Sequence, residues 1–313
     1  MRRLAALLIA LVFVAVPAAA KDLPPPAETI DLWSGSPPPG SGKPAGPEKI
    51  GKEGAATGAY WNITQPRMEI YRPANPNGAA VLVIGGGGYF RIQIGSAAKP
   101  IAERLMRRGI TAIVLYYRLP GDGWNDDAPF QDGQRAMRML RYGATRFGID
   151  PARLGVIGFS AGGHLAGMLA TRGGHDFYPK RDAIDAQSAI PAFAGMIYPV
   201  VSLRAPIDTT RTFKELSGLP DFVNAFSVEA QVGPATPPVF LAHAADDPIA
   251  DVEHSLRMFA AMRAARRPVE MHIFETGGHS FGVGKPGTLV AAWPRLFLTW
   301  LEAQGVIKRE EKD

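Results

Sequence analysis

The sequence has no cysteine among its 313 residues. This absence excludes disulfide bonds, thiolate catalysis, cysteine-ligated zinc and a lipoprotein anchor. A strong excess of one charge is also missing, because the formal net charge is +5 and the basic residues are scattered along the chain. We therefore expect neither nucleic acid nor an anionic membrane as a partner. After the first twenty residues no apolar run approaches the roughly 18 residues of a membrane-spanning helix, so we expect no stable membrane insertion of the mature chain.

The N-terminus has the three parts of a secretory signal peptide. Met1-Arg2-Arg3 is basic, residues 4–16 are apolar, and Ala18-Ala19-Ala20 is an A-x-A cleavage site. Cleavage after Ala20 would remove residues 1–20 and lower the formal charge from +5 to +3. Because an exported protein without disulfides suits a bacterium, we expect a periplasmic or secreted protein.

Proline and glycine are abundant in the next segment, residues 21–58, which includes two triplets of proline at 24–26 and 37–39. This composition predicts an extended arm rather than a domain. Trp33 interrupts the polar stretch, and we expect its indole to dock the arm onto the body of the protein. An aromatic platform for a sugar is the alternative interpretation of Trp33.

Residues 59–313 alternate between apolar runs of strand length and amphipathic segments of helix length. The predicted strands are 61–63, 67–71, 79–84, 111–116, 154–157, 194–199, 239–243 and 269–274, and the predicted helices are 97–108, 131–147, 165–170, 252–265 and 289–304. Strands that alternate with helices imply right-handed crossovers. The pattern predicts an α/β fold, with a central mostly parallel sheet flanked by helices. Residues 200–236 show little periodicity and are predicted to form a small cap-like insertion beside the site.

The segment Gly158-Phe159-Ser160-Ala161-Gly162 follows a predicted strand and precedes a predicted helix. This is the G-x-S-x-G context of a nucleophile elbow, where glycines on both sides allow the serine to adopt a strained conformation. The pattern favours Ser160 as a catalytic nucleophile. The alternative is a glycine-rich turn that contains an incidental serine.

Four glycines and a tyrosine, Gly85 to Tyr89, follow the predicted strand 79–84. A phosphate loop would need a lysine or a G-x-G-x-x-G spacing that is absent here. The oxyanion loop of an α/β-hydrolase fits better, and a flexible connector is the third interpretation. We therefore expect the backbone N–H groups of Gly87, Gly88 and Ala161 to form the oxyanion hole, and we assign Tyr89 to substrate binding.

A nucleophilic serine needs a base and an orienting acid, which follow it in α/β-hydrolase order. His279 lies in a glycine-rich loop after the last predicted strand, and Asp246 and Asp247 follow the strand before it. We predict His279 as the base and Asp247 as the acid, with Asp246 as the second choice. His243 is expected to secure the acid loop. A metal site built from these four residues is the weaker alternative, because no known metal-binding motif is present.

The remaining histidines are expected to be structural. His164 should form a buried hydrogen bond within the elbow helix, His272 lies within a predicted strand, and His175 and His254 are expected at the surface. The predicted chemistry is attack by Ser160 on an ester, with an acyl-enzyme that water releases. It needs no cofactor and no metal.

The sequence resembles bacterial α/β-hydrolases of the acetyl xylan esterase type, which are related to the esterase/lipase and feruloyl-esterase-like families. The resemblance covers nearly all of the mature chain and rests on these segments: Asp31-Leu32-Trp33, Gly86-Gly87-Gly88-Tyr89, Tyr117-Arg118-Leu119, Gly158 to Ala166, His243 to Pro248 and Gly277-Gly278-His279. It implies a triad of Ser160, Asp247 and His279 and the deacylation of carbohydrate esters. The chain departs from the family at Gly85, Ile94-Gly95, Ile249-Ala250 and Ser280, in loops that shape the pocket.

From these observations we expect an exported serine carboxylesterase that hydrolyses short acyl esters. The resemblance points to acetyl esters of carbohydrates such as xylan. A serine peptidase or a lipase on the same fold, or a non-catalytic carbohydrate-binding protein, are the alternatives.

Overall fold

A computed structural model describes residues 23–34 and 38–309, so the predicted signal peptide over residues 1–20 lies outside the described residues. Eight strands form one sheet in the order β1-β4-β7-β5-β8-β9-β10-β11. Their bounds are β1 Glu28–Asp31, β4 Arg67–Tyr71, β5 Ala80–Ile84, β7 Thr111–Tyr116, β8 Leu154–Phe159, β9 Ala194–Ile197, β10 Val239–Ala244 and β11 Val269–Phe274. The pairs β1–β4 and β4–β7 are antiparallel and the rest are parallel, which confirms the predicted mostly parallel sheet.

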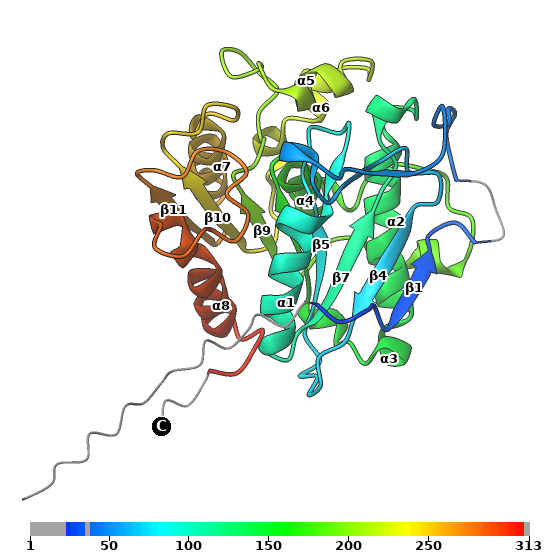
Figure 1. Ribbon diagram of the computed structural model, residues 1–313, viewed down its shortest axis with the longest axis horizontal. Coiled ribbons are helices and arrows are strands. Elements are labelled where there is room, and N and C mark those ends of the chain that lie inside the picture. The colour runs from blue at the N-terminus through cyan, green and yellow to red at the C-terminus, as the bar shows by residue number, and fades with distance from the viewer. Residues whose placement is uncertain (1–22, 35–37, 310–313) are drawn as a thin grey trace, which may run out of the picture.

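Helices cover both faces of the sheet (Figure 1). The longer helices are α1 Lys99–Arg107, α2 Ala128–Tyr142, α4 Ala161–Arg172, α7 Glu253–Ala264 and α8 Trp293–Ala303. Figure 1 shows α1 and α8 in front of the sheet and α2, α4 and α7 behind it. Every residue of β5, β7 and β8 is buried as a result. This double coverage explains why these strands are continuous apolar runs in the sequence rather than alternating ones.

Two predicted helices are divided. The segment predicted as a single helix over 131–147 consists of α2 and a short α3 (Ala144–Phe147), with Gly143 between them. A Cβ atom at Gly143 would lie 2.5 Å from the ring of Phe147, so the close packing of that ring requires glycine at the break. Likewise, the predicted helix 289–304 begins as a 3₁₀ turn, η7 (Leu289–Ala292), before α8.

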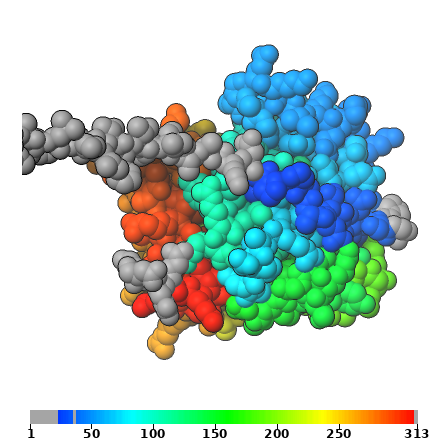
Figure 2. Space-filling view, turned by 60° about the horizontal axis from the view of Figure 1, so that its bottom comes forward, coloured from blue at the N-terminus to red at the C-terminus, as the bar shows by residue number. Residues whose placement is uncertain are grey.

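The N-terminal arm is part of the fold rather than an appendage. Its strand β1 forms the edge of the main sheet, and β2 (Lys49–Ile50) joins β3 (Ala59–Trp61) and β6 (Ile92–Gln93) in a second, three-stranded sheet. The predicted boundary after residue 58 therefore runs through a sheet. Figure 2 shows the blue N-terminal segment lying across the surface of the body.

Trp33 docks this arm, as the sequence predicted. Its side chain is buried, and the indole Nε1 donates a 2.7 Å hydrogen bond to Oδ1 of Asp132 on α2. The same carboxylate pairs with Arg118 at 2.8 Å, and neither side chain is exposed. Arg118 also donates a 2.7 Å hydrogen bond to the carbonyl of Pro39. The buried pair therefore anchors the arm at two points, so its charges are satisfied where solvent cannot reach them.

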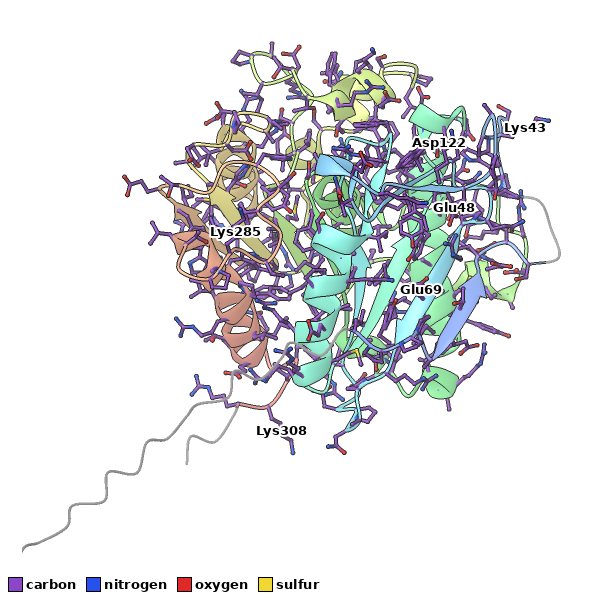
Figure 3. The ribbon with its side chains drawn as sticks, in the orientation of Figure 1. Lys43, Glu48, Glu69, Asp122, Lys285 and Lys308 are labelled. Atoms are coloured by element: carbon purple, nitrogen blue, oxygen red, sulfur yellow. The ribbon has the colours of Figure 1, made fainter. Side chains whose placement is uncertain are left out.

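A third anchor lies further along the arm. The guanidinium of Arg67 on β4 forms a two-pronged ion pair with Glu48, at 2.7 and 2.9 Å. Asp122, on the same side of the molecule as Glu48 in Figure 3, accepts a 3.1 Å hydrogen bond from the backbone N–H of Ile63. Burial raises the pKa of Asp122 to about 6.

The predicted insertion over residues 200–236 contains α5 (Arg211–Leu216), α6 (Phe222–Ala225) and a 3₁₀ turn, η6 (Val228–Gln231). In Figure 1 α5 and α6 lie above the upper edge of the sheet. Within the described part of the chain, no helix is long and apolar enough to cross a membrane.

Candidate active site

Ser160 occupies the turn between β8 and α4 with φ 53° and ψ −119°, a backbone conformation that residues other than glycine rarely adopt. A Cβ atom at Gly158 would lie 1.9 Å from the carbonyl oxygen of Gly162. At Gly162 it would lie 2.4 Å from the carbonyl oxygen of Ile84. The two glycines of the motif are therefore needed to let α4 pack closely against the ends of β5 and β8.

The structure brings Ser160 and His279 together although 119 residues separate them. Nε2 of His279 lies 2.8 Å from Oγ of Ser160, and Nδ1 lies 2.7 Å from Oδ2 of Asp247. A carboxylate only accepts, so Nδ1–H donates to Asp247 and Nε2 is left to accept the proton of the serine hydroxyl. This arrangement gives the imidazole the tautomer that a general base requires.

The two adjacent aspartates have different partners. Oδ1 of Asp246 accepts hydrogen bonds from the backbone N–H groups of Gly277 and Gly278, at 2.9 and 2.7 Å. Asp246 thus contacts the loop that carries His279, whereas only Asp247 contacts the imidazole. The geometry favours Asp247 as the orienting acid, which was the first choice from the sequence.

Asp247 is held in place from both sides. Its Oδ1 accepts from the backbone N–H groups of Ile249 and Ala250, at 2.8 and 2.9 Å. Burial raises the pKa of its carboxyl, but hydrogen bonds from His243 and His279 outweigh burial and hold the pKa well below its usual range. Asp247 is therefore ionised at neutral pH and can stabilise an imidazolium at His279.

His243 secures the acid loop, as the sequence predicted. Its Nε2 lies 3.1 Å from Oδ2 of Asp247 and 2.9 Å from the carbonyl oxygen of Ala250. Both partners are acceptors, so Nε2 carries a proton. Its Nδ1 contacts the hydroxyl of Ser255 on α7 at 2.8 Å. The ring thus connects the carboxylate to α7.

Tyr89 does not bind substrate in this arrangement, which corrects the sequence-based assignment. Its side chain has no exposed surface, and its hydroxyl lies 2.9 Å from Nδ1 of His164. Nε2 of His164 faces the carbonyl oxygen of Phe226 at 2.8 Å, which confirms the buried hydrogen bond expected for His164. The turn over Gly87 to Phe90 directs Tyr89 into the core and the next side chain, Phe90, toward the cavity. The sequence gives no signal for this direction, because a loop has no side-chain periodicity.

A second correction concerns His254. Expected at the surface, it is fully buried on α7, and its Nδ1 accepts from the backbone N–H groups of Val201 and Ser202. Burial lowers the pKa of His254 to about 3 and that of His164 to about 4. Both rings are neutral at physiological pH. His175 is exposed, as expected.

The glycine loop approaches Ser160 closely. A Cβ atom at Gly86 would lie 2.9 Å from Cβ of Ser160, and Gly87 and Gly88 have φ values of 128° and 62°. None of the described residues accepts a hydrogen bond from the backbone N–H of Gly87 or Gly88. The N–H of Ala161, at the first position of α4, has no partner within the helix. These are the three groups that the sequence predicted for an oxyanion hole.

Ser160 and His279 open into a cavity of about 240 Å³. The insertion contributes one wall through Val200 and Thr210 to Thr212, and Tyr198 and Ile249 add apolar surface. Arg91, Gln93 and Ser96 form another part of the lining and were not identified from the sequence. Their position directly after the glycine loop is the only sequence signal that could have indicated them.

No group of three or more His, Asp or Glu side chains is placed to hold a metal ion in the described parts of the chain, residues 23–34 and 38–309. The four residues of the weaker metal interpretation are used otherwise: His243 and His279 contact Asp247, and Asp246 accepts from backbone N–H groups.

Comparisons with known proteins agree with this architecture. The chain matches the family described as BD-FAE over residues 68–262. It is 28% identical over 226 residues to the acetylxylan esterase of Xylanibacter ruminicola, which covers 70% of this chain and 44% of that protein. It is 30% identical over 207 residues to endo-1,4-beta-xylanase B of Butyrivibrio fibrisolvens, which covers 65% of this chain and 32% of that protein. The chain thus spans less than half the length of these two relatives.

Solved structures extend the likeness. The acetyl ester-xyloside bifunctional hydrolase of Caldicellulosiruptor lactoaceticus is 32% identical with a TM-score of 0.76, over 90% of this chain and 98% of that one. An esterase of Thermogutta terrifontis, solved with propionate bound, has the same fold, with a TM-score of 0.69 at 23% identity over 79% of this chain and 92% of that one. The chain therefore belongs to the BD-FAE family, and its predicted resemblance to α/β-hydrolases of the esterase type is confirmed.

Proposed function

We propose that this protein is an exported serine carboxylesterase that removes short acyl groups, chiefly acetyl, from carbohydrates such as xylan. The observation that carries the proposal is the hydrogen-bonded series Ser160, His279 and Asp247, at 2.8 and 2.7 Å, which opens into the cavity of about 240 Å³. A nucleophile, a base and an orienting acid at such distances are the components of serine acyl transfer.

In the proposed reaction Oγ of Ser160 attacks the ester carbonyl while Nε2 of His279 takes the hydroxyl proton. The negative charge on the carbonyl oxygen is held by the N–H groups of Gly87, Gly88 and Ala161, each worth roughly 3–4 kcal/mol of transition-state stabilisation. His279 then gives its proton to the departing alcohol, which leaves an acyl group on Ser160. Water, deprotonated by His279, attacks this acyl-enzyme and releases the carboxylic acid, and the serine regains its proton.

The choice of a short acyl group has two supports. The cavity is small, and the glycine loop and two threonines of the insertion form part of its lining. The relatives named above include an acetylxylan esterase and an acetyl ester-xyloside hydrolase, which supports both an acetyl group and a carbohydrate alcohol in the substrate.

Export is supported by the signal-peptide pattern of residues 1–20. Recovery from the periplasm or medium of a chain that begins at Lys21 is the expected result, and retention of Met1 on the recovered chain would oppose export.

Hydrolysis of p-nitrophenyl acetate, butyrate and octanoate tests the activity. We expect acetate to be preferred, and Ser160→Ala to lower kcat by about 10⁶-fold while the circular dichroism spectrum stays unchanged. Ser188 is exposed and distant in sequence from the site, so Ser188→Ala is the matched control and should retain activity. Preference for octanoate would favour the lipase interpretation. If no ester were cleaved in a Ser160-dependent way, the peptidase or the binding-protein interpretation would replace this one.

A further inference from the structure

A second cavity, of about 520 Å³, adjoins the one at Ser160. Arg91, Gln93, Ser96 and Ser280 line both cavities, so the two are neighbours along this wall. The other side of the second cavity is formed by the end of the N-terminal arm, just before β3, through Gly54, Ala55, Thr57 and Gly58. The arm therefore has a role in shaping the site as well as in the sheet.

The second cavity lies on the side of the departing alcohol. In the reaction proposed above, His279 hands its proton to the alcohol oxygen, so the alcohol must lie next to His279. Ser280 follows His279 directly and lines both cavities. An alcohol larger than a few atoms would therefore extend past Ser280 into the second cavity.

Arg91 is the charged group at the junction. Its side chain is half-buried, and its guanidinium lies 5.0 Å from the centre of the Phe90 ring. Its Nε is buried without a hydrogen-bond partner, and none of the described residues forms an ion pair with it. The terminal nitrogens of a guanidinium form a planar fork that matches a carboxylate, and no carboxylate of the described residues occupies the fork of Arg91.

A second guanidinium lies near the same aromatic ring but is already neutralised. Arg211 is 4.9 Å from the centre of the Phe90 ring and forms an ion pair with Glu215 at 2.5 Å. Among the described residues that line either cavity, none is Asp or Glu. The positive charge of Arg91 is therefore not compensated within the site.

Two other polar side chains of this wall, Gln93 and Ser96, already form hydrogen bonds. Nε2 of Gln93 donates to the carbonyl oxygen of Ala55 at 3.0 Å, and Oγ of Ser96 donates to Oε1 of Gln93 at 3.0 Å. These contacts hold Gln93 between Ala55 of the arm and Ser96 in the turn Ile94–Ala98 that precedes α1. Arg91 is therefore the group in this wall that can recognise a charged ligand.

We propose that Arg91 is a specificity-determining residue that binds a carboxylate on the alcohol part of the substrate, such as the uronic acid side group of an acidic xylo-oligosaccharide ester. This inference rests on the proposed function and narrows its substrate class. The carboxylate accepts hydrogen bonds from the two terminal nitrogens of Arg91 in the second cavity, while the acyl group enters the first cavity beside Ser160. Substrates that carry the carboxylate are bound more tightly than neutral ones of the same length.

The test compares kcat/KM for acetylated xylo-oligosaccharides with and without one glucuronic acid group. We expect wild type to prefer the acidic substrate by about 10- to 100-fold, the range of charge-assisted hydrogen bonds. Arg91→Gln should reduce this ratio to about one, and Arg91→Lys should restore part of it. Taking the ratio within each variant removes any general loss of activity. Arg263, exposed on α7 and outside both cavities, provides Arg263→Gln as a control with the same charge change, which should keep the wild-type ratio.

Binding gives a readout that does not depend on turnover. Calorimetry with Ser160→Ala and the deacetylated acidic oligosaccharide should give a Kd about 10- to 100-fold lower than that of Ser160→Ala/Arg91→Gln. An equal ratio in wild type and Arg91→Gln would overturn the inference while leaving the esterase proposal intact. If Arg91 instead gave a preference for 4-nitrophenyl hemisuccinate over a neutral 4-nitrophenyl ester, and none for the acidic sugar ester, the carboxylate would lie on the acyl side. That result would overturn the assignment to the alcohol. Absence of Ser160-dependent ester hydrolysis would be a failure of the proposed function itself.

Discussion

His243 and His279 contact the same oxygen atom: Oδ2 of Asp247 lies 3.1 Å from Nε2 of His243 and 2.7 Å from Nδ1 of His279. His243 is itself held by the carbonyl of Ala250 and the hydroxyl of Ser255. The carboxylate is thereby fixed in the plane that orients His279, and Asp246 lacks any such contact. The two aspartates should therefore differ sharply in their importance.

Asp247→Asn should lower kcat by about 10³- to 10⁴-fold, because an amide at this position favours the wrong tautomer of His279. Asp246→Asn keeps a side-chain oxygen that can accept from the N–H groups of Gly277 and Gly278, so it should lower kcat by about tenfold or less. Steady-state kinetics on p-nitrophenyl acetate measure both. Equal modest losses in the two variants would contradict the assignment of Asp247.

Stability should fall as pH is lowered from 7.5 to 5, because His254 and His164 are buried in their neutral form. Their folded pKa values, about 3 and about 4, lie below the ordinary value of 6.5. As pH falls, these histidines are therefore protonated in the unfolded state before they are protonated in the folded state. The stabilisation is complete above pH 6.5 and is lost as pH falls toward 4, by about 2 kcal/mol for each histidine at pH 5. The lowered pKa of Asp247 acts in a separate window, below its ordinary value of 3.8, where protonation removes stability.

Urea denaturation of wild type and His254→Asn at pH 7.5 and 5 tests this expectation. Asparagine can still accept from the N–H groups of Val201 and Ser202, so the variant should fold and lose about 2 kcal/mol less than wild type between the two pH values. His175 is exposed, and His175→Asn should keep most of the wild-type dependence. An equal free energy of unfolding at pH 7.5 and pH 5 would contradict the expectation that His254 and His164 are buried in their neutral form.

Gly162→Ala should both destabilise the fold and impair the nucleophile. The added methyl group would lie 2.4 and 2.6 Å from the carbonyl oxygens of Ile84 and Gly85, which are backbone atoms that cannot turn aside. We expect a loss of about 1–3 kcal/mol in the free energy of unfolding and a fall in kcat as α4 moves away from the sheet. Gly174, whose added methyl would meet its nearest atom at 3.9 Å, provides the control Gly174→Ala, with a change within about 0.5 kcal/mol. Wild-type stability and turnover in Gly162→Ala would show that the elbow tolerates a side chain there.

Much of the architecture could be predicted because buried parallel strands are recognisable in the sequence as continuous apolar runs. The run from Ala80 to Ile84 and the strand from Leu154 to Phe159 are apolar throughout, since helices cover both of their faces. The hydrogen-bonded series of the candidate site could be predicted for a related reason. Ser160, Asp247 and His279 each follow a predicted strand, and the carboxyl ends of parallel strands meet at one edge of the sheet.

Other features carried no local signal. The burial of His254 depends on the insertion that packs over α7, and the inward direction of Tyr89 depends on a turn with positive φ. The proline-rich segment was predicted to be an extended arm docked by Trp33, and the structure adds that β1 pairs with β4 and that Trp33 reaches Asp132 across 99 residues of chain. Such contacts join segments far apart in the chain, so neither segment by itself indicates its partner.

The sequence by itself therefore determined the sheet and the elbow, predicted Ser160 and His279, and limited the acid to Asp247 or Asp246, because periodicity and the order of motifs are properties of the chain itself. The tertiary structure alone decided which aspartate meets His279, which side chains face the cavity and which guanidinium is left uncompensated. Those outcomes depend on contacts that the order of the chain does not reveal: His279 meets Asp247 across 32 residues, and no carboxylate of the described residues forms an ion pair with Arg91.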